Sequence, residues 1–148
     1  MKNIEILVVS LSSPLLVGLY ENGVKFGEIC EQEHVSEALI SILENLNQKY
    51  NIKKIIYANT PGSFMGLKVA YVILKTFCMV KECEFYAISG FELNDGGPIR
   101  ANKILSFVKR NNEITLEKIE PKGFCLPQNL DNLKLKKDTL PDYIIQAV

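Results

Sequence analysis

A glycine-containing turn at residues 59–68 is the part of the sequence best suited to bind another molecule. It reads Asn-Thr-Pro-Gly-Ser-Phe-Met-Gly-Leu-Lys and follows an apolar run at residues 55–58. A strand, such a turn and a helix can present backbone N–H groups to an anion or to a partner protein. The alternative is a purely structural turn, in which Pro61 sets φ, Gly62 permits an unusual backbone and Ser63 caps the helix.

Few side chains in this sequence could carry out acid–base or nucleophilic chemistry. His34 is the only histidine, and the candidate nucleophiles are Ser10, Ser12, Ser13 and Ser63. A single imidazole is insufficient for the usual zinc sites, and no triad of nucleophile, histidine and acid is readable in the sequence. The sequence therefore predicts no catalytic residue, no metal site and no cofactor.

The cysteines and the charge balance narrow the function classes further. Cys30, Cys78, Cys83 and Cys125 form no C-x-x-C pair, and Cys30 and Cys78 lie in apolar runs that predict buried thiols. Acidic and basic residues balance at 17 each, so no overall charge draws the chain to nucleic acid or to an anionic membrane. No segment approaches the ~20 apolar residues of a membrane helix, and no signal peptide is convincing. We expect a cytoplasmic protein.

The elements that position the turn follow from hydrophobic periodicity. Apolar runs predict strands at 4–9, 15–20, 24–30, 53–58 and 84–88, and helical spacing predicts helices at 35–46 and 63–78. The order β-β-β-α-β-α-β predicts an α/β fold with a mixed sheet. We place residues 1–96 in this lobe. Residues 97–148 are expected to form a reduced, β-rich second lobe packed on the first, with strands at 103–109 and 114–119 and irregular structure from residue 121.

Both predicted helices carry an apolar stripe. Leu39 and Ile42 lie on the first, and Leu67, Ala70 and Leu74 lie on the second. Ile40 lies off the first stripe, where it either widens the buried face or marks a second contact surface. We expect that so small a domain cannot readily bury both the second stripe and the widened first helix on one side of its sheet. The remaining apolar surface would then mark an interface.

Several motifs, taken in order along the chain, resemble one family. Pro-Gly-Ser-Phe-Met-Gly-Leu-Lys-Val at residues 61–69 resembles the P-G-S-F-T-G-L-R signature of the TsaB family, also called YeaZ. Ala-Ile-Ser-Gly-Phe-Glu at 87–92 is similar to its G-V-S-x-L-E segment, and Leu-Pro-Asp-Tyr-Ile at 140–144 is similar to its C-terminal P-x-Y-L segment. The resemblance implies the ribonuclease-H-like fold of the actin, Hsp70 and sugar-kinase (ASKHA) superfamily, here in a minimal member.

The resemblance also implies a function and partners. TsaB is a subunit of the bacterial machinery that makes N6-threonylcarbamoyladenosine in tRNA. By resemblance, this chain is expected to be a non-catalytic scaffold that stabilises a TsaD-like catalytic subunit, helps to recruit a TsaE-like ATPase, and meets tRNA only through the complex. A homodimer through the same surface is expected when the partner is absent. The expected interface residues are Val35, Leu39, Ile42, Gly62, Ser63, Phe64, Gly66, Leu67, Ala70, Tyr71 and Leu74.

One departure from the family pattern bears on the alternatives. After the first strand, typical members carry a D-T-S/A-T stretch, whereas this chain reads Ser-Leu-Ser-Ser-Pro at residues 10–14. No carboxylate is present there to hold a magnesium–phosphate complex. This disfavours a degenerate ATPase or phosphotransferase, which is the main alternative function. Peptidase activity and direct RNA binding are weaker alternatives.

Overall fold

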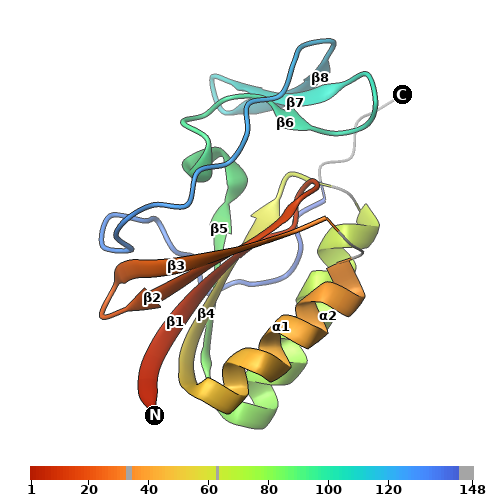
Figure 1. Cartoon of the computed structure of the whole chain (residues 1–148). Coiled ribbons are helices and arrows are strands. Elements are labelled where there is room, and N and C mark those ends of the chain that lie inside the picture. Colours follow the sequence, from red (N-terminus) through yellow and green to blue (C-terminus); the bar gives the residue numbers. More distant parts are fainter. Residues whose placement is uncertain (33–34, 63, 144–148) are drawn as a thin grey trace.

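The computed structural model describes residues 1–32, 35–62 and 64–143. Within them, a sheet of five strands has the order β3-β2-β1-β4-β5 and carries two helices (Figure 1). The elements of this lobe are β1 (Lys2–Val9), β2 (Leu15–Glu21), β3 (Val24–Glu31), α1 (Val35–Lys49), β4 (Tyr50–Thr60), α2 (Phe64–Lys81) and β5 (Glu84–Ser89). β1, β2 and β3 pair antiparallel, whereas β4 pairs parallel with both β1 and β5. The predicted mixed α/β, ribonuclease-H-like sheet is confirmed.

Both helices cover the same face of the sheet. Their buried side chains, including Leu39 and Leu74, form one core with residues of all five strands. Most residues of both stripes are therefore buried on this side of the sheet, whereas Ile40, which would widen the first stripe, stays 47% exposed. The sheet is five strands wide, which leaves room for α1 and α2 to lie side by side upon it (Figure 1).

The C-terminal part of the chain covers the opposite face. A short 3-10 helix, η1 (Gly90–Leu93), leads into a small antiparallel sheet of β6 (Ile99–Arg100), β7 (Ser106–Arg110) and β8 (Glu113–Glu117). The second core joins apolar residues of the large sheet, such as Leu7 and Ile56, with Phe107 and Leu126. The predicted hairpin around Asn111 is confirmed, with slightly shorter strands.

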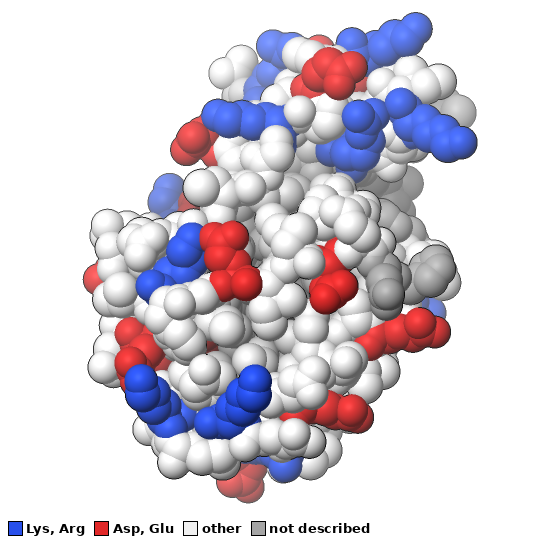
Figure 2. All heavy atoms as spheres, viewed as in Figure 1, with Lys and Arg blue, Asp and Glu red and all other residues white. Residues whose placement is uncertain are grey.

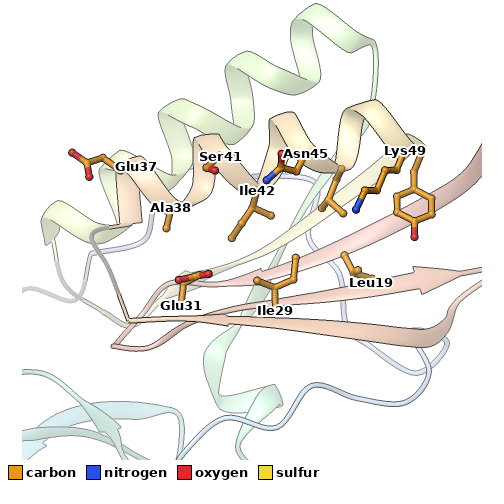
Figure 3. A pocket seen from close by; sticks show the side chains of 11 residues that line it. Leu19, Ile29, Glu31, Glu37, Ala38, Ser41, Ile42, Asn45 and Lys49 are labelled. Carbon is orange, nitrogen blue, oxygen red and sulfur yellow. The ribbon is translucent and has the colours of Figure 1, made fainter.

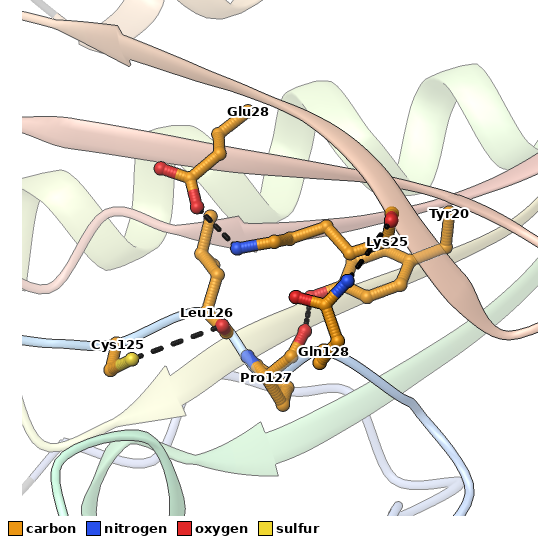
Figure 4. A network of polar contacts seen from close by, with 7 residues as sticks. All are labelled: Tyr20, Lys25, Glu28, Cys125, Leu126, Pro127 and Gln128. Atoms are coloured by element: carbon orange, nitrogen blue, oxygen red, sulfur yellow. Dashed lines mark hydrogen bonds and ion pairs between the residues drawn. The ribbon is translucent and has the colours of Figure 1, made fainter.

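Residues 121–143 run back along the large sheet as an irregular strap. Backbone bridges join Val24 to Asn129 at one edge and Ala87 to Lys136 at the other. The Tyr20 hydroxyl donates to the Pro127 carbonyl at 2.7 Å (Figure 4). Desolvation by burial raises the pKa of this tyrosine, so its hydroxyl stays a hydrogen-bond donor.

The strap continues past the edge of β5 and reaches β4. The Tyr57 hydroxyl donates to the Thr139 carbonyl, and Asn59 Nδ2 donates to the Leu140 carbonyl at 2.9 Å. The two bonds join residues that are 82 and 81 positions apart in the sequence, and they anchor the strap near the end of β4. The strap is thus part of the folded lobe rather than a loose tail.

The cysteines differ from the sequence prediction in one case. Cys78 is buried as predicted, but Cys30 is exposed. β3 lies at the edge of the sheet and alternates exposed and half-buried residues, and Cys30 falls on an exposed position. Burial raises the pKa of the Cys78 thiol to about 12 and also raises that of Cys83.

These environments predict the order in which the thiols react. At pH 8, Ellman's reagent should modify the exposed Cys30 and Cys125 rapidly and Cys78 slowly, because the thiolate is the reactive form and Cys78 remains protonated. Replacing Cys30 and Cys125 with serine should remove the fast phase, and unfolding in urea should expose the remaining thiols. Fast modification of Cys78 in the native chain would contradict the burial described for α2.

Candidate functional site

The carboxyl ends of β1, β4 and β5 lie at one edge of the large sheet because these strands are parallel. Three connections leave from this edge, namely residues 10–14, the turn that begins at Pro61, and η1. Ligands of open α/β sheets bind outside the carboxyl ends of the strands. This edge, which contains the glycine-containing turn, is therefore the first place to look for a site.

Leu11 fills the space at this edge. Its side chain is 1% exposed and belongs to the second core. A Cβ added at Gly62 would lie 2.9 Å from Leu11 Cδ2, and one at Gly90 would overlap Leu11 Cδ1. At both positions, glycine lets the backbone lie close to the Leu11 side chain. Gly62 was among the residues predicted from the sequence, whereas Leu11 and Gly90 were not.

Polar atoms are buried at the carboxyl ends of β1 and β4. Ser10 Oγ, Asn59 Oδ1 and Thr60 Oγ1 have no hydrogen-bond partner among the described residues, and their side chains belong to residues at most 6% exposed. Buried oxygens of this kind commonly bind ordered water. Ser10 and Thr60 could donate to or accept from a neutral ligand, but none of the three side chains carries a charge to bind phosphate or magnesium.

One predicted interface residue, Ser63, lies outside the described residues, and of Phe64 only the backbone is described. The lone histidine, His34, lies outside the described residues as well. Among the residues that are described, no three His, Cys, Asp or Glu side chains come together as metal ligands. No described helix is long and apolar enough to cross a membrane.

The predicted interface stripe lies mostly underneath the helices. Leu39, Leu67, Ala70 and Leu74 are fully buried, and Ile42 is nearly so. Val35, Gly62, Gly66 and Tyr71 are half-buried. In this fold the stripe contacts the chain's own core, so a docking partner would meet other side chains of α1 and α2.

Those other side chains form a second apolar surface. Ile40, Val72 and Val80 are exposed by 47%, 52% and 71%, on the sides of α1 and α2 that face away from the sheet. They border a groove of about 460 Å³ between the two helices. Its other lining residues are Leu43, Glu44, Asn47, Ile73, Thr76, Phe77 and Lys81. The sequence signal was Ile40, an apolar residue off the buried stripe.

Comparison with solved structures identifies the fold. The chain aligns with YeaZ from Pseudomonas aeruginosa at a TM-score of 0.59 and 14% sequence identity, over 79% of this chain and 64% of that one. An uncharacterized protein described as similar to peptidase YeaZ, also from Pseudomonas aeruginosa, aligns over the same shares at a TM-score of 0.58 and 14% identity. No protein-family model matches the sequence, and neither does any curated protein. The resemblance to YeaZ is thus confirmed at the level of the fold, and the chain spans 64% of the length of these relatives.

The close packing at the carboxyl edge can be tested by a double-mutant cycle. Gly90→Ala should lower the free energy of unfolding by about 1–3 kcal/mol through overpacking, and Leu11→Ala by about 2–5 kcal/mol through the cavity that it leaves. The loss in free energy of unfolding of the double variant should be smaller than the sum of the two single losses by at least ~0.5 kcal/mol. The reason is that the methyl group added at Gly90 occupies space vacated by the leucine. Urea unfolding measures all four proteins. Strict additivity would show that Leu11 does not fill this space.

Proposed function

We propose that this chain is a non-catalytic scaffold subunit of the tRNA N6-threonylcarbamoyladenosine machinery and binds a TsaD-like catalytic subunit. The observation that carries the proposal is the exposed apolar surface over α1 and α2, on a lobe with the YeaZ fold. Apolar side chains exposed next to one another on a small domain mark an interaction surface.

The outer face of α1 and α2 has the composition of a docking site. Leu43, Ile73 and Phe77 line the groove between the helices, and Glu44 and Lys81 contribute charged groups to its lining. Protein interfaces commonly have an apolar centre and a polar rim. Helices of a partner from the same superfamily could pack on this face, and a second copy of the chain could occupy it when that partner is absent.

The carboxyl edge of the sheet supports a non-catalytic role. Leu11 lies in the stretch that corresponds to the D-T-S/A-T segment of typical family members, and the unpartnered oxygens at the ends of β1 and β4 belong to uncharged side chains. Catalysis would then reside in the TsaD-like partner. A TsaE-like ATPase would join the complex of the two, and tRNA would be contacted through that complex. The overall charge balance of 17 acidic and 17 basic residues is consistent with this indirect contact, and side chains of both signs are present on the face shown in Figure 2.

Charge placed on the outer face should prevent docking. Val80→Asp and Ile40→Asp should each weaken binding to the cognate TsaD-like protein by ~10-fold or more, since each buries an unpaired carboxylate at the contact. Both side chains are exposed, at 71% and 47%, so the isolated variants should keep their stability. Light scattering of the mixed proteins measures the complex.

Ile104→Asp is the matched control for these variants. Ile104 is 60% exposed and lies between β6 and β7, away from α1 and α2. The Ile104→Asp variant should bind the TsaD-like protein as the unaltered chain does. In a tRNA-modification assay with and without the chain, the activities should rank in the same order as the binding of the variants. If Val80→Asp and Ile40→Asp both bind as tightly as the unaltered chain, the outer face of α1 and α2 is not the docking surface.

A further inference from the structure

A second groove lies on the other side of α1, between this helix and β3 (Figure 3). Its volume is about 630 Å³. The side chains of Leu19 and Ile29 rise from the sheet toward Ala38 and Ile42 of the helix, which gives the groove an apolar floor (Figure 3). Ser41 and Asn45 lie along the helical wall. No residue of this groove belongs to the lining of the α1–α2 groove described above.

β3, which forms the other wall, is an edge strand of the large sheet. Among the described residues, the strap pairs only with the end of β3 that lies next to the turn between β2 and β3. There the Lys25 N–H donates to the Gln128 carbonyl and the Leu130 N–H donates to the Gly23 carbonyl, both at 2.9 Å. A register shift opposite Leu19 and Tyr20 follows. From residue 26 to residue 31, no described segment pairs with the outer side of β3.

An extended peptide can use both walls at once. Its backbone can add to the free edge of β3 while alternate side chains enter the groove between strand and helix. The chain's own strap already adds to β3 in this antiparallel way at its hairpin end. The rest of the edge offers the same kind of backbone partners.

The charges at the two ends of the groove define an orientation. Glu31 and Glu37 lie at the end where β3 stops and α1 begins, and Lys49 lies at the opposite end beside Tyr50. None of these three charged side chains forms an ion pair with a described residue. A segment antiparallel to β3 would begin at the acidic end and finish at Lys49.

We propose that this groove binds an extended peptide segment of a partner protein, added antiparallel to residues 26–31 of β3. The segment carries Lys or Arg toward its N-terminal end, Asp or Glu toward its C-terminal end, and β-branched apolar residues at alternate positions between them. This site lies on the opposite side of α1 from the surface in the scaffold proposal, and it does not depend on that proposal.

Two synthetic peptides of identical composition test the orientation. The first is acetyl-Lys-Thr-Val-Thr-Val-Thr-Glu-amide, and the second has its Lys and Glu exchanged. Titration of the isotope-labelled full chain, followed by amide NMR, should show the first peptide shifting signals of β3 and of the Glu37–Lys49 side of α1. The second should bind about tenfold more weakly, because both of its charges meet like charges.

Exchange of the groove charges should invert this preference. Glu37→Lys combined with Lys49→Glu changes exposed side chains only, and this variant should bind the second peptide more tightly than the first. Glu44→Lys, on the other side of α1, is the control and should leave the original preference unchanged. Equal binding of both peptides, an unaltered preference after the exchange, or no shifts at millimolar peptide would each overturn the proposal. Shifts confined to Ile40 and Val80 would overturn it as well.

Discussion

A sheet with apolar side chains on both faces must be covered on both faces, and this requirement organises the whole chain. In β1, Ile4, Ile6 and Val8 belong to one core, whereas Leu7 and Val9 belong to the other. The helices α1 and α2 cover the first face, so the C-terminal part must cover the second. The strap is therefore as much a part of the fold as the helices. Its hydrogen bonds at both sheet edges fix its path over otherwise exposed apolar surface.

The strands and helices could be predicted from sequence because each has a short period of its own. The path of the strap could not, because its contacts, such as Ala87 with Lys136, join distant residues without periodicity. The helical stripes show a different limit. A run such as Leu67, Ala70 and Leu74 indicates that a face is buried, but the same pattern arises whether the chain's own sheet or a partner covers it. Cys30 was mispredicted for a related reason, since an apolar run does not reveal that its strand lies at the sheet edge.

The candidate site was predictable in part. The absence of an acidic residue at positions 10–14 is visible in the sequence. That Leu11 lies between Gly62 and Gly90 is not, because it depends on three connections that meet only when β1, β4 and β5 align in parallel. Helix α1 likewise separates two grooves whose existence follows from its placement over the sheet. One groove opens toward α2 and the other toward β3, so one helix can support two separate contacts.

The filled carboxyl edge has a consequence for how the chain is maintained in a cell. A protein that binds a nucleotide or metal only when folded gains stability by mass action, and it loses that stability when the ligand is scarce. Here the space between Gly62 and Gly90 is occupied by Leu11, a side chain of the chain itself. Its contribution to packing at this edge is therefore present in every folded copy and does not vary with the concentration of a ligand.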